Sequence, residues 1–360
     1  MKQEIRFCTS ADGTRIAYAL SGKGPPLVLA ANWVTHLEYQ WRNLSWRALL
    51  ETLSKHYTVL RYDTRGCGLS DWNVADISLD GWIHDFEAVI SAAGFERFPI
   101  LGVCQGGAIA VEYAVRHPDQ VTKLFLHATF ARGRLKRAAT PREVELVKLR
   151  YEVARAGWAN ESHAFLRAFA AMWQPGGNAE HQRSWCELQR ASCTAETAVR
   201  HFQLADDMDV RDAAARVRCP TLVIHAEQDQ VVPVEEGRLC AGLIPNARYV
   251  QLESENHLLL ENEPAWARFL DELAAFIPAT PPARKQKPFS DLSAREADVL
   301  ELLARGRDNA QIAASLDLSE KTVRNYITRV FDKLGVENRA QAIVLARDAG
   351  FGVTGATLVK

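Results

Sequence analysis

The chain has 360 residues, more than twice the roughly 150 residues of an average domain, so its length allows two folded units. Hydrophobic residues make up 48% and the formal net charge is −1, an ordinary globular composition that excludes neither a catalytic nor a binding role. No apolar run approaches the roughly 20 residues that span a bilayer, and the polar start Met1–Ser10 is unlike a signal peptide. The seven cysteines are scattered without a Cys-x-x-Cys pair, which favours reduced thiols over disulfides or a zinc site. We therefore expect a cytoplasmic protein without a metal or cofactor.

Short apolar runs alternate with longer amphipathic stretches through the first three quarters of the chain. The runs are Leu27–Ala30, Thr58–Tyr62, Phe98–Gly102, Lys123–His127 and Thr221–His225. This alternation is typical of the α/β class, in which helices cover a mostly parallel sheet. Residues of about 132–215 interrupt the alternation because they contain no convincing strand. We interpret them as a helical insertion that covers the sheet.

The most informative segment of this part is Ile100–Gly107, which reads Ile-Leu-Gly-Val-Cys-Gln-Gly-Gly. An apolar strand enters Gly102, Cys104 occupies the turn, and a helix begins near Gly106. Glycines flank the turn because a sharp strand-to-helix turn leaves no room for a Cβ atom. Such a turn lifts the central side chain above the sheet, as in a nucleophile elbow, here with Cys in the usual place of Ser. The alternative is a cysteine that serves as a small buried hydrophobic residue.

Two further residues follow the cysteine in an order that is typical of one enzyme fold. The strand beginning at Thr221 leads to Asp229, and His257 follows another short strand at Tyr249–Leu252. Nucleophile, acid and histidine in this chain order are typical of α/β hydrolases. Asp63–Ser70 also has the pattern D-x-R-G-x-G-x-S found in that fold. Residues of about 5–277 therefore resemble the α/β-hydrolase fold.

The resemblance implies a catalytic triad. Cys104 would be the nucleophile, His257 the base, and Asp229 the acid that orients the histidine. A thiolate attacks esters and lactones readily, because some of it exists at neutral pH. The alternative is that Asp229 and His257 survive as a structural pair in an inactive body.

The resemblance also implies an oxyanion hole and a ligand pocket. The backbone amides of Gln105 and of Trp33 would bind the oxyanion. The usual His-Gly loop is replaced here by Ala30-Ala-Asn-Trp33, which argues against a fast enzyme because a side chain stands where the backbone must approach the substrate. Aromatic residues of the insertion would line the pocket, although such residues are as often part of a core. The expected pocket residues are Asn32, Trp33, Trp158, Phe165 and Trp173.

A basic, proline-rich segment at residues 278–289 ends this first domain, which covers 1–277. Four prolines in the eleven residues Pro278–Pro288 interrupt helix and sheet, so we interpret the segment as a stiff tether. The remaining residues, 290–360, are expected to form four helices. Ser293 and Glu296 form a capping box that opens the first helix, which extends to about Arg305. The other helices are expected at Asn309–Leu316, Glu320–Leu334 and Asn338–Asp348.

The third of these helices has two distinct faces. Val323, Ile327, Val330 and Leu334 recur at three- and four-residue spacing and are expected to face a core. The opposite side and its flank carry Lys321, Arg324, Asn325, Thr328, Arg329 and Lys333. A helix that lies in the DNA major groove needs an apolar back and such donors for base edges and phosphates. A solvated face on a small helical bundle would show the same pattern.

A wider pattern distinguishes these alternatives. Residues 292–306 read Leu-Ser-x-Arg-Glu-Ala-x-Val-Leu-x-Leu-Leu-Ala-x-Gly, and residues 309–323 read Asn-x-x-Ile-Ala-x-x-Leu-x-Leu-Ser-x-x-Thr-Val. Residues 333–342 add Lys-Leu-Gly-Val-x-x-Arg-x-x-Ala. Residues 290–350 resemble the LuxR-type helix-turn-helix family over almost their whole length. The fold class we expect is therefore an α/β-hydrolase fold with a helical cap, followed by a small all-α, four-helix LuxR-type domain.

This second resemblance implies binding to double-stranded DNA. By position, Arg324, Asn325 and Thr328 would read bases, and Thr322 and Lys333 would contact phosphates. Tyr326 stands where a His is common in the family, so contacts there are expected to differ. The family's fourth helix supplies a dimer face, and two modules on a two-fold axis would bind an inverted repeat. We expect a homodimer with an apolar stripe formed by Ala340, Ile343, Val344 and Ala346-Arg347.

Three functions fit these observations. The first is a DNA-binding transcriptional regulator whose hydrolase-like pocket senses a small ester, lactone, amide or carboxylate, and slowly cleaves it or holds it covalently. The second is an active cysteine-dependent hydrolase fused to a DNA-binding domain. The third is an inactive hydrolase fold used as a dimerisation scaffold. We favour the first, because pocket occupancy can bias DNA binding when the ligand binds two states of the protein with different affinity.

Overall fold

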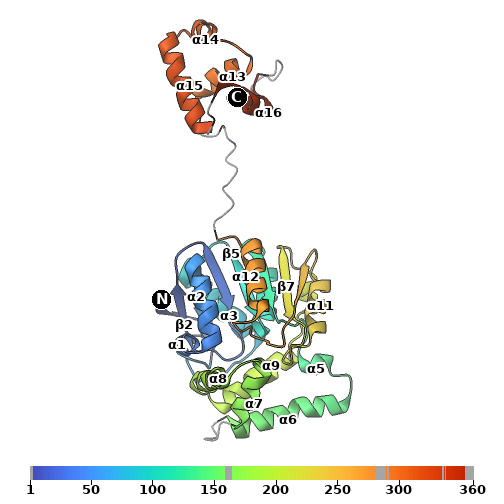
Figure 1. Cartoon of the computed structure of the whole chain (residues 1–360). Helices are drawn as coiled ribbons and strands as arrows, with labels where there is room; N and C mark the ends of the chain where they lie inside the picture. The colour runs from blue at the N-terminus through green and yellow to red at the C-terminus, as the bar shows by residue number, and fades with distance from the viewer. Residues whose placement is uncertain are drawn as a thin grey trace. The chain divides into compact units, whose positions relative to one another are not determined.

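The computed structural model describes residues 3–158, 164–279, 289, 292–334, 336 and 338–352. The chain divides into two compact units, Met1–Thr280 and Pro281–Lys360, and each is described here by itself (Figure 1). Most of the expected tether, residues 280–288, lies outside the described residues.

The first unit contains a sheet of eight strands in the order β1-β2-β4-β3-β5-β6-β7-β8 within the described residues. The strands are β1 (Gln3–Thr9), β2 (Arg15–Ser21), β3 (Pro26–Ala30), β4 (Thr58–Tyr62), β5 (Phe98–Val103), β6 (Val121–His127), β7 (Thr221–Ala226) and β8 (Arg248–Leu252). From β4 across to β8, neighbouring strands are parallel. The α/β fold predicted from the sequence is confirmed.

The first two strands were not predicted from the sequence. β1 pairs antiparallel with β2, which in turn pairs antiparallel with β4. β1 lies at the edge of the sheet and is mostly exposed, with polar residues at several positions. It therefore lacks the continuous apolar run that identifies a strand buried on both faces.

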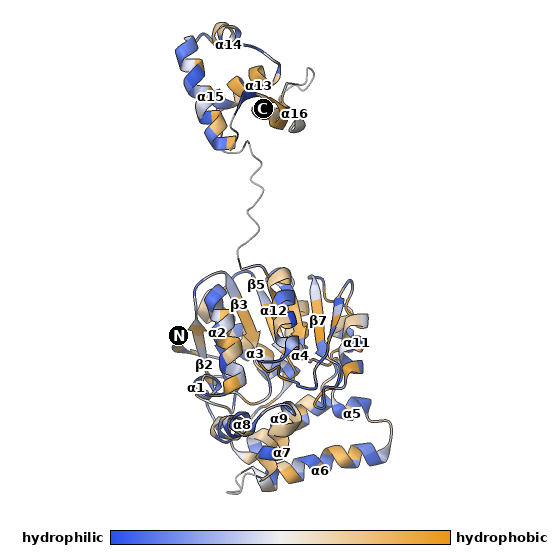
Figure 2. Ribbon diagram, viewed as in Figure 1, coloured by the Kyte–Doolittle hydropathy of each residue, from blue (hydrophilic) through white to orange (hydrophobic). Residues whose placement is uncertain are grey.

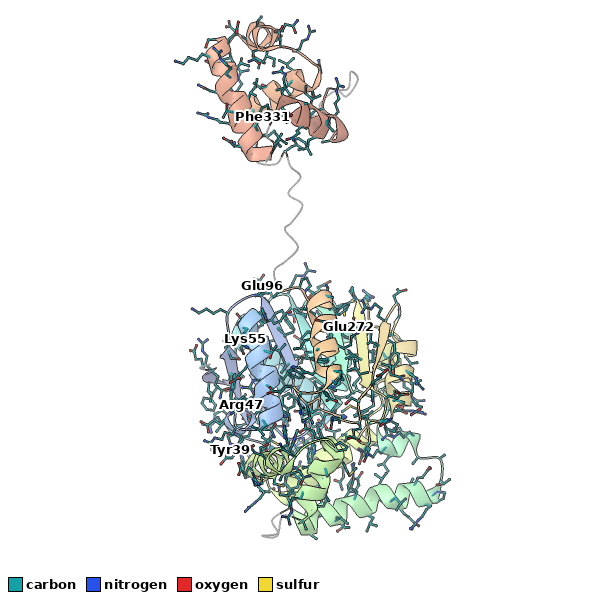
Figure 3. All side chains as sticks on the ribbon, viewed as in Figure 1. Tyr39, Arg47, Lys55, Glu96, Glu272 and Phe331 are labelled. Atoms are coloured by element: carbon teal, nitrogen blue, oxygen red, sulfur yellow. The ribbon has the colours of Figure 1, made fainter. Side chains whose placement is uncertain are left out.

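Helices cover the sheet and turn their polar sides outward. Figure 1 shows α2 (Leu44–His56) and α12 (Pro264–Phe276) in front of the sheet. Also in the first unit are α1 (Leu37–Gln40), α3 (Leu79–Ala93), α4 (Gln105–Arg116) and α11 (Val234–Leu243). The labelled Arg47 and Lys55 lie along the exposed side of α2 in Figure 3, and Leu50 on the same helix is fully buried. Figure 2 shows the same contrast, with orange strands inside and blue positions on the outer helices.

A group of helices between β6 and β7 lies together below the sheet in Figure 1. They are α5 (Arg134–Arg137), α6 (Pro141–Gly157), α7 (Ala164–Trp173), α8 (Ala179–Ser192) and α9 (Ala195–Asp207). The next helix, α10 (Arg211–Ala214), packs on α4 and α11 instead. We call the helices α5 to α9 the cap. The cap helices pack on one another, α6 on α9 and α7 on α8.

The second unit consists of α13 (Ala294–Ala304), α14 (Asn309–Leu316), α15 (Glu320–Leu334) and α16 (Arg339–Asp348) in its described part. The expected helix bounds are confirmed to within one residue. Ser293 and Glu296 form the predicted capping box at the start of α13, and Asp308 and Gln311 form a second one at the start of α14. Phe331, labelled in Figure 3, contacts both apolar clusters of this unit and so joins α15 to its core.

Among the described residues, no helix is both long enough and apolar enough to cross a membrane.

Candidate functional site

The turn between β5 and α4 holds Cys104 in a strained backbone conformation. Its φ of 54° and ψ of −125° lie where residues other than glycine are uncommon. A Cβ atom on Gly102 would lie 2.6 Å from the Cα of Gly107, and one on Gly106 would lie 2.6 Å from the carbonyl oxygen of Ala30. Both positions therefore require glycine. The backbone has the geometry of a nucleophile elbow, with the Cys104 side chain at the N-terminus of α4.

The structure brings Asp229 and His257 together. Asp229 follows β7, His257 follows β8, and Cys104 follows β5, so all three lie near the carboxyl ends of parallel strands. His257 Nδ1 is 2.7 Å from Asp229 Oδ2, and both side chains are fully buried. The other carboxylate oxygen, Oδ1, accepts hydrogen bonds from the backbone amides of Val231 and Val232. These bonds fix the carboxylate, which in turn orients the imidazole.

The surroundings of Asp229 and His257 favour the charged form of both side chains. Burial opposes the charged form of His257, but the Asp229 carboxylate and the Cys104 thiol next to it raise the histidine pKa to about 10. Burial likewise opposes charge on Asp229, but His257 and His225 hold the pKa of that carboxyl far below its ordinary value. His225 Nε2 lies 3.4 Å from Asp229 Oδ2 and 2.9 Å from the carbonyl oxygen of Val232. His257 is therefore expected to be an imidazolium at neutral pH.

The second ring nitrogen of His257 is available for chemistry. Nε2 is buried and makes no hydrogen bond of ordinary geometry with the described protein atoms. The Cys104 thiol is nevertheless close enough to contribute to the raised pKa of His257. An imidazolium beside a thiol stabilises the thiolate, which is the reactive form.

The expected oxyanion residues lie at the same place. Gln105 opens α4, immediately after Cys104, so its backbone amide belongs to the helix N-terminus that attracts negative charge. The side chains of Trp33 and Asn32 are 3% and 4% exposed, so the loop that replaces the usual glycine-containing segment is packed into the protein.

A narrow pocket with an interior volume of about 30 Å³ opens beside Cys104. Of the expected pocket residues, Trp33 and Trp173 line it, and Trp173 also packs edge-on against the His257 ring at 4.6 Å. Asn32, Trp158 and Phe165 do not line it. Trp158 instead donates its indole N–H to the carbonyl oxygen of Cys193, and Phe165 packs against Phe169. Phe165 therefore belongs to the packing within the cap, and the Trp158 ring packs edge-on against Trp33 at 5.6 Å.

Several residues that line the pocket were not predicted from the sequence. They are Gln105 (predicted only for its backbone), Phe130, Gly133, Arg134, Arg137, Arg150, Phe169, Phe202, Ala205, Asp206, Val231 and Val232. Most come from the cap, where no motif identifies them. The only signal available was the cluster of arginines at the start of the insertion, Arg132–Arg137.

The structure contains no group of three or more His, Cys, Asp or Glu side chains placed to hold a metal ion, in the part of the chain it describes. The site thus offers a thiol, an imidazole and backbone amides for chemistry on a carbonyl group.

In the second unit, α15 presents the expected donors to solvent. Lys321, Arg324, Asn325, Thr328 and Arg329 are exposed, and Val323, Ile327 and Val330 on the opposite side are buried. None of the ion pairs between described residues involves Lys321, Arg324 or Arg329. Those cations therefore remain available to a polyanion.

Three neighbouring residues behave differently from the exposed donors. Lys333 lies 2.6 Å from Glu296, the carboxylate of the α13 capping box, so its ammonium already has an anionic partner. The Thr322 hydroxyl lies 2.8 Å from that of Ser319. Tyr326 is half-buried and packs against the core of the unit, which removes most of its ring from the outer face of α15.

The apolar stripe expected on α16 is partly wrong. Val344 is 60% exposed and Ala340 is also exposed. Ala346, however, is fully buried against Leu300 and Ala304 of α13. Its small side chain lets α16 approach α13 closely, so it belongs to the core and cannot contribute to a dimer face.

The family comparisons agree with both units. The family model of the alpha/beta hydrolase fold matches residues 30–264, well over half of the chain. The model of the bacterial regulatory proteins of the luxR family matches residues 290–346. The chain belongs to the alpha/beta hydrolase fold family, and a LuxR-type helix-turn-helix DNA-binding domain follows its hydrolase domain.

Individual relatives resemble the first unit. The pyrrolizixenacetamide deacetylase of Xenorhabdus hominickii is 25% identical over 248 residues, which are 69% of this chain and 90% of that protein. The crystal structure of the enol-lactonase from Burkholderia xenovorans LB400 has a TM-score of 0.61 at 25% identity and covers 75% of this chain and 99% of that one. An esterase from Exiguobacterium antarcticum has a TM-score of 0.63 at 23% identity over 75% of this chain and 98% of its own, which shows the shared fold alone.

Proposed function

We propose that the protein is a cytoplasmic transcriptional regulator whose DNA binding depends on a small acyl compound held at Cys104. The observation that carries this proposal is the thiol at a nucleophile elbow, beside a buried Asp229–His257 pair, in a chain that also carries a LuxR-type domain. A relative named as a deacetylase and a fold neighbour named as an enol-lactonase support an acyl compound as the ligand class.

The proposed chemistry begins with attack of Cys104 Sγ on the carbonyl carbon of an ester or lactone. A C–S bond forms, and the charge that develops on the carbonyl oxygen is stabilised by the backbone amide of Gln105. His257 then gives its Nε2 proton to the leaving oxygen as the C–O bond breaks, which leaves a thioester on Cys104. The now neutral His257 takes a proton from water, whose oxygen attacks the thioester carbon. The C–S bond breaks, which releases the acid and restores the thiolate and the imidazolium.

A slow final step would make the pocket a sensor. Trp33, Trp173, Phe169 and Phe202 surround the site with aromatic rings, which exclude the water that hydrolysis of the thioester requires. The acylated protein would then persist long enough to shift an equilibrium between two states of different DNA affinity. A differential free energy of about 1–3 kcal/mol is enough for such coupling.

The DNA-binding half of the proposal rests on α15. Arg324, Asn325 and Thr328 would contact base edges, while Lys321, Thr322, Arg329 and Lys333 would contact phosphates. A homodimer would place two such helices on the two halves of an inverted repeat. The exposed Ala340 and Val344 of α16 support a small dimer contact in this unit.

An active hydrolase is the second candidate. The 2.7 Å contact between His257 Nδ1 and Asp229, which leaves Nε2 facing the reaction, favours it, because an oriented imidazolium can donate its Nε2 proton to the leaving group and act as a base after that transfer. Turnover separates this candidate from the sensor, since both form the same thioester.

The test uses the full chain and a duplex selected by it from a random pool. 4-Nitrophenyl acetate reports acylation, and mass spectrometry reports the adduct on Cys104. We expect one rapid equivalent of nitrophenolate, a persistent acetyl adduct and a changed affinity for the selected duplex. Cys104→Ala should lose the burst and the change in affinity but keep binding to the duplex. Many turnovers per site with unchanged affinity for DNA would contradict the ligand-dependent regulator and favour the active hydrolase.

A further inference from the structure

The pocket beside Cys104 carries an excess of positive charge at its cap end. Arg134 and Arg137 of α5 and Arg150 of α6 line it together with Cys104. Asp206 is the one acidic residue among the lining residues of this pocket in the described structure. Three guanidinium groups therefore face a single carboxylate inside a partly closed space, where charges are screened less than in water.

The single carboxylate is already fully engaged. Asp206 is 1% exposed and receives hydrogen bonds from Arg134, Arg150 and the Tyr151 hydroxyl. Arg134 is further fixed by a 2.6 Å hydrogen bond to the carbonyl oxygen of Val231. These contacts hold two arginines in place, but they leave the pocket with more positive than negative charge.

Arg137 differs from its neighbours. Among the described residues, its guanidinium takes part in no ion pair and no hydrogen bond. Burial and the adjacent Arg134 lower its pKa, which reflects a positive environment around it. The charged groups near it are Arg132, Arg134, Glu236 and Asp206. Arg132 and Glu236 pair with each other at 3.2 Å, so they do not neutralise Arg137.

Other buried donors around the same pocket also lack partners. Trp33 Nε1, Trp173 Nε1, Gln105 Nε2 and Arg150 Nε are all buried without a hydrogen bond to the described protein atoms. Indole and guanidinium nitrogens can only donate. Because an unsatisfied buried donor costs free energy, a bound molecule that supplies acceptor oxygens recovers that cost.

From this arrangement we propose that the cap end of the pocket is a carboxylate-binding subsite, in which Arg137 and Arg150 bind a second, anionic group of the acyl ligand. The ligand class is thus an ester, lactone or amide that also carries a carboxylate, with an apolar part that packs against the aromatic rings of Phe169 and Phe202. The Arg150 guanidinium lies 4.4 Å from the Phe202 ring centroid, so the charged and aromatic parts of the subsite adjoin. This inference rests on the proposed function, because it names the ligand class of the same site.

The first experiment measures binding without requiring catalysis. The probes are 4-phenylbutanoate and its neutral counterpart 4-phenylbutanamide, with phenyl phosphate as a second anion. Their affinities for the full chain are measured by protection of Cys104 from iodoacetamide and, independently, by the rise in Tm. We expect the carboxylate to bind roughly tenfold to a hundredfold more tightly than the amide, as a charge-assisted hydrogen bond requires.

Variants at the subsite then assign the preference to Arg137. Arg137→Gln should bring the carboxylate-to-amide ratio close to one, while Arg137→Lys should retain part of it. Lys136→Gln is the matched control, since Lys136 lies on the same helix but is exposed and paired with Asp207 at 2.8 Å. Arg150→Lys keeps the positive charge and loses the Nε donor, so it should reduce the ratio only in part. The Tm of each variant without probe shows whether it is folded.

Three results would overturn the subsite. These are equal binding of carboxylate and amide by the natural chain, a preference that survives Arg137→Gln, and tighter binding of phenyl phosphate than of the carboxylate.

DNA binding separates this inference from the proposed function. If the carboxylate binds through Arg137 but does not change the affinity for the selected duplex, the carboxylate subsite is supported and the proposed control of DNA binding by the ligand is contradicted. If a neutral ester changes the affinity for DNA and the pocket shows no preference for a carboxylate, the control of DNA binding by the ligand is supported and the carboxylate subsite is contradicted.

Discussion

The two units of this chain present their functional groups in opposite ways. In the hydrolase unit the candidate residues are buried, and several donors that face the pocket, among them Trp33 Nε1 and Gln105 Nε2, have no partner. In the DNA-binding unit Arg324 and Asn325 are exposed on α15 and hydrated. A buried unsatisfied donor costs free energy until a ligand arrives, whereas an exposed cation only exchanges water and counterions for phosphate.

The two sites also differ in how many segments of the chain contribute to them. The donors of the second unit come from consecutive turns of one helix, so their arrangement follows from a period of 3.6 residues. The pocket draws on the segments that follow β3, β5, β6 and β7 and on the cap, which are separated by many residues along the chain. A substitution in the pocket is therefore expected to act through contacts with other segments, and one on α15 through a single contact with DNA.

The largest effect is expected at His257. Replacement by Gln removes the imidazolium that stabilises the Cys104 thiolate and should slow alkylation of Cys104 by about 10²- to 10⁴-fold. Modification rates of all seven cysteines are read from peptide masses after treatment with iodoacetamide. Cys67 is the internal control, because it also contacts a histidine, at 3.6 Å from His201 Nε2, but is fully buried and outside the pocket. If Cys104 reacts no faster than the surface-proximal Cys8, its proposed reactivity is wrong.

The Asp229–His257 pair should also make stability depend on pH. The folded-state pKa of His257, about 10, exceeds the ordinary value of 6.5, so the stabilisation is fully present below about pH 6.5 and is lost as pH rises toward 10. The difference in unfolding free energy between the natural chain and His257→Gln should shrink over that range, by at most about 1.4 kcal/mol per pH unit. Urea unfolding at several pH values, followed by a signal of the hydrolase unit, measures it. A difference that stays constant over that range would mean that His257 is already neutral in the folded protein.

A smaller effect is expected from Arg324→Ala in the other unit. Loss of a bidentate contact to a base should cost about 1–3 kcal/mol of binding free energy and relax specificity at one base pair. Competition between the selected duplex and single-base variants measures both quantities. Reactivity of Cys104 should not change, because the two residues belong to different units. An equal loss of affinity for every sequence would instead make Arg324 a phosphate contact.

The sequence allowed good prediction wherever a local rule fixed the geometry. Capping residues such as Ser293 defined the helix ends of the second unit, and the glycines around Cys104 defined the elbow. The contact between Asp229 and His257, 28 residues apart, was expected from chain order and is present at 2.7 Å. Both features follow from short motifs that leave the backbone few alternatives.

The lining of the pocket could not be predicted in the same way. Trp158 and Phe165 were expected there but do not line it, while Arg137 and Arg150 were missed. Whether a cap side chain faces the pocket depends on how α5, α6 and α9 pack against one another. That packing is decided by contacts between distant segments, on which helix periodicity alone carries no information.

The smallest effect is expected at Lys333. Its position in the family pattern predicts a phosphate contact, yet its ammonium lies 2.6 Å from Glu296, and this ion pair lowers the pKa of the Glu296 carboxyl to about 2. Because the pair is partly exposed, Lys333→Gln should reduce the stability of the module by less than about 1 kcal/mol. If Lys333 also contacts a phosphate, the same variant lowers the salt dependence of DNA binding by about one unit, evenly across sequences. An unchanged salt dependence, with only the small loss of stability, would assign Lys333 to the core of the module. The cations of the DNA face would then be Lys321, Arg324 and Arg329, which take part in no ion pair between described residues, unlike Asp206 in the pocket.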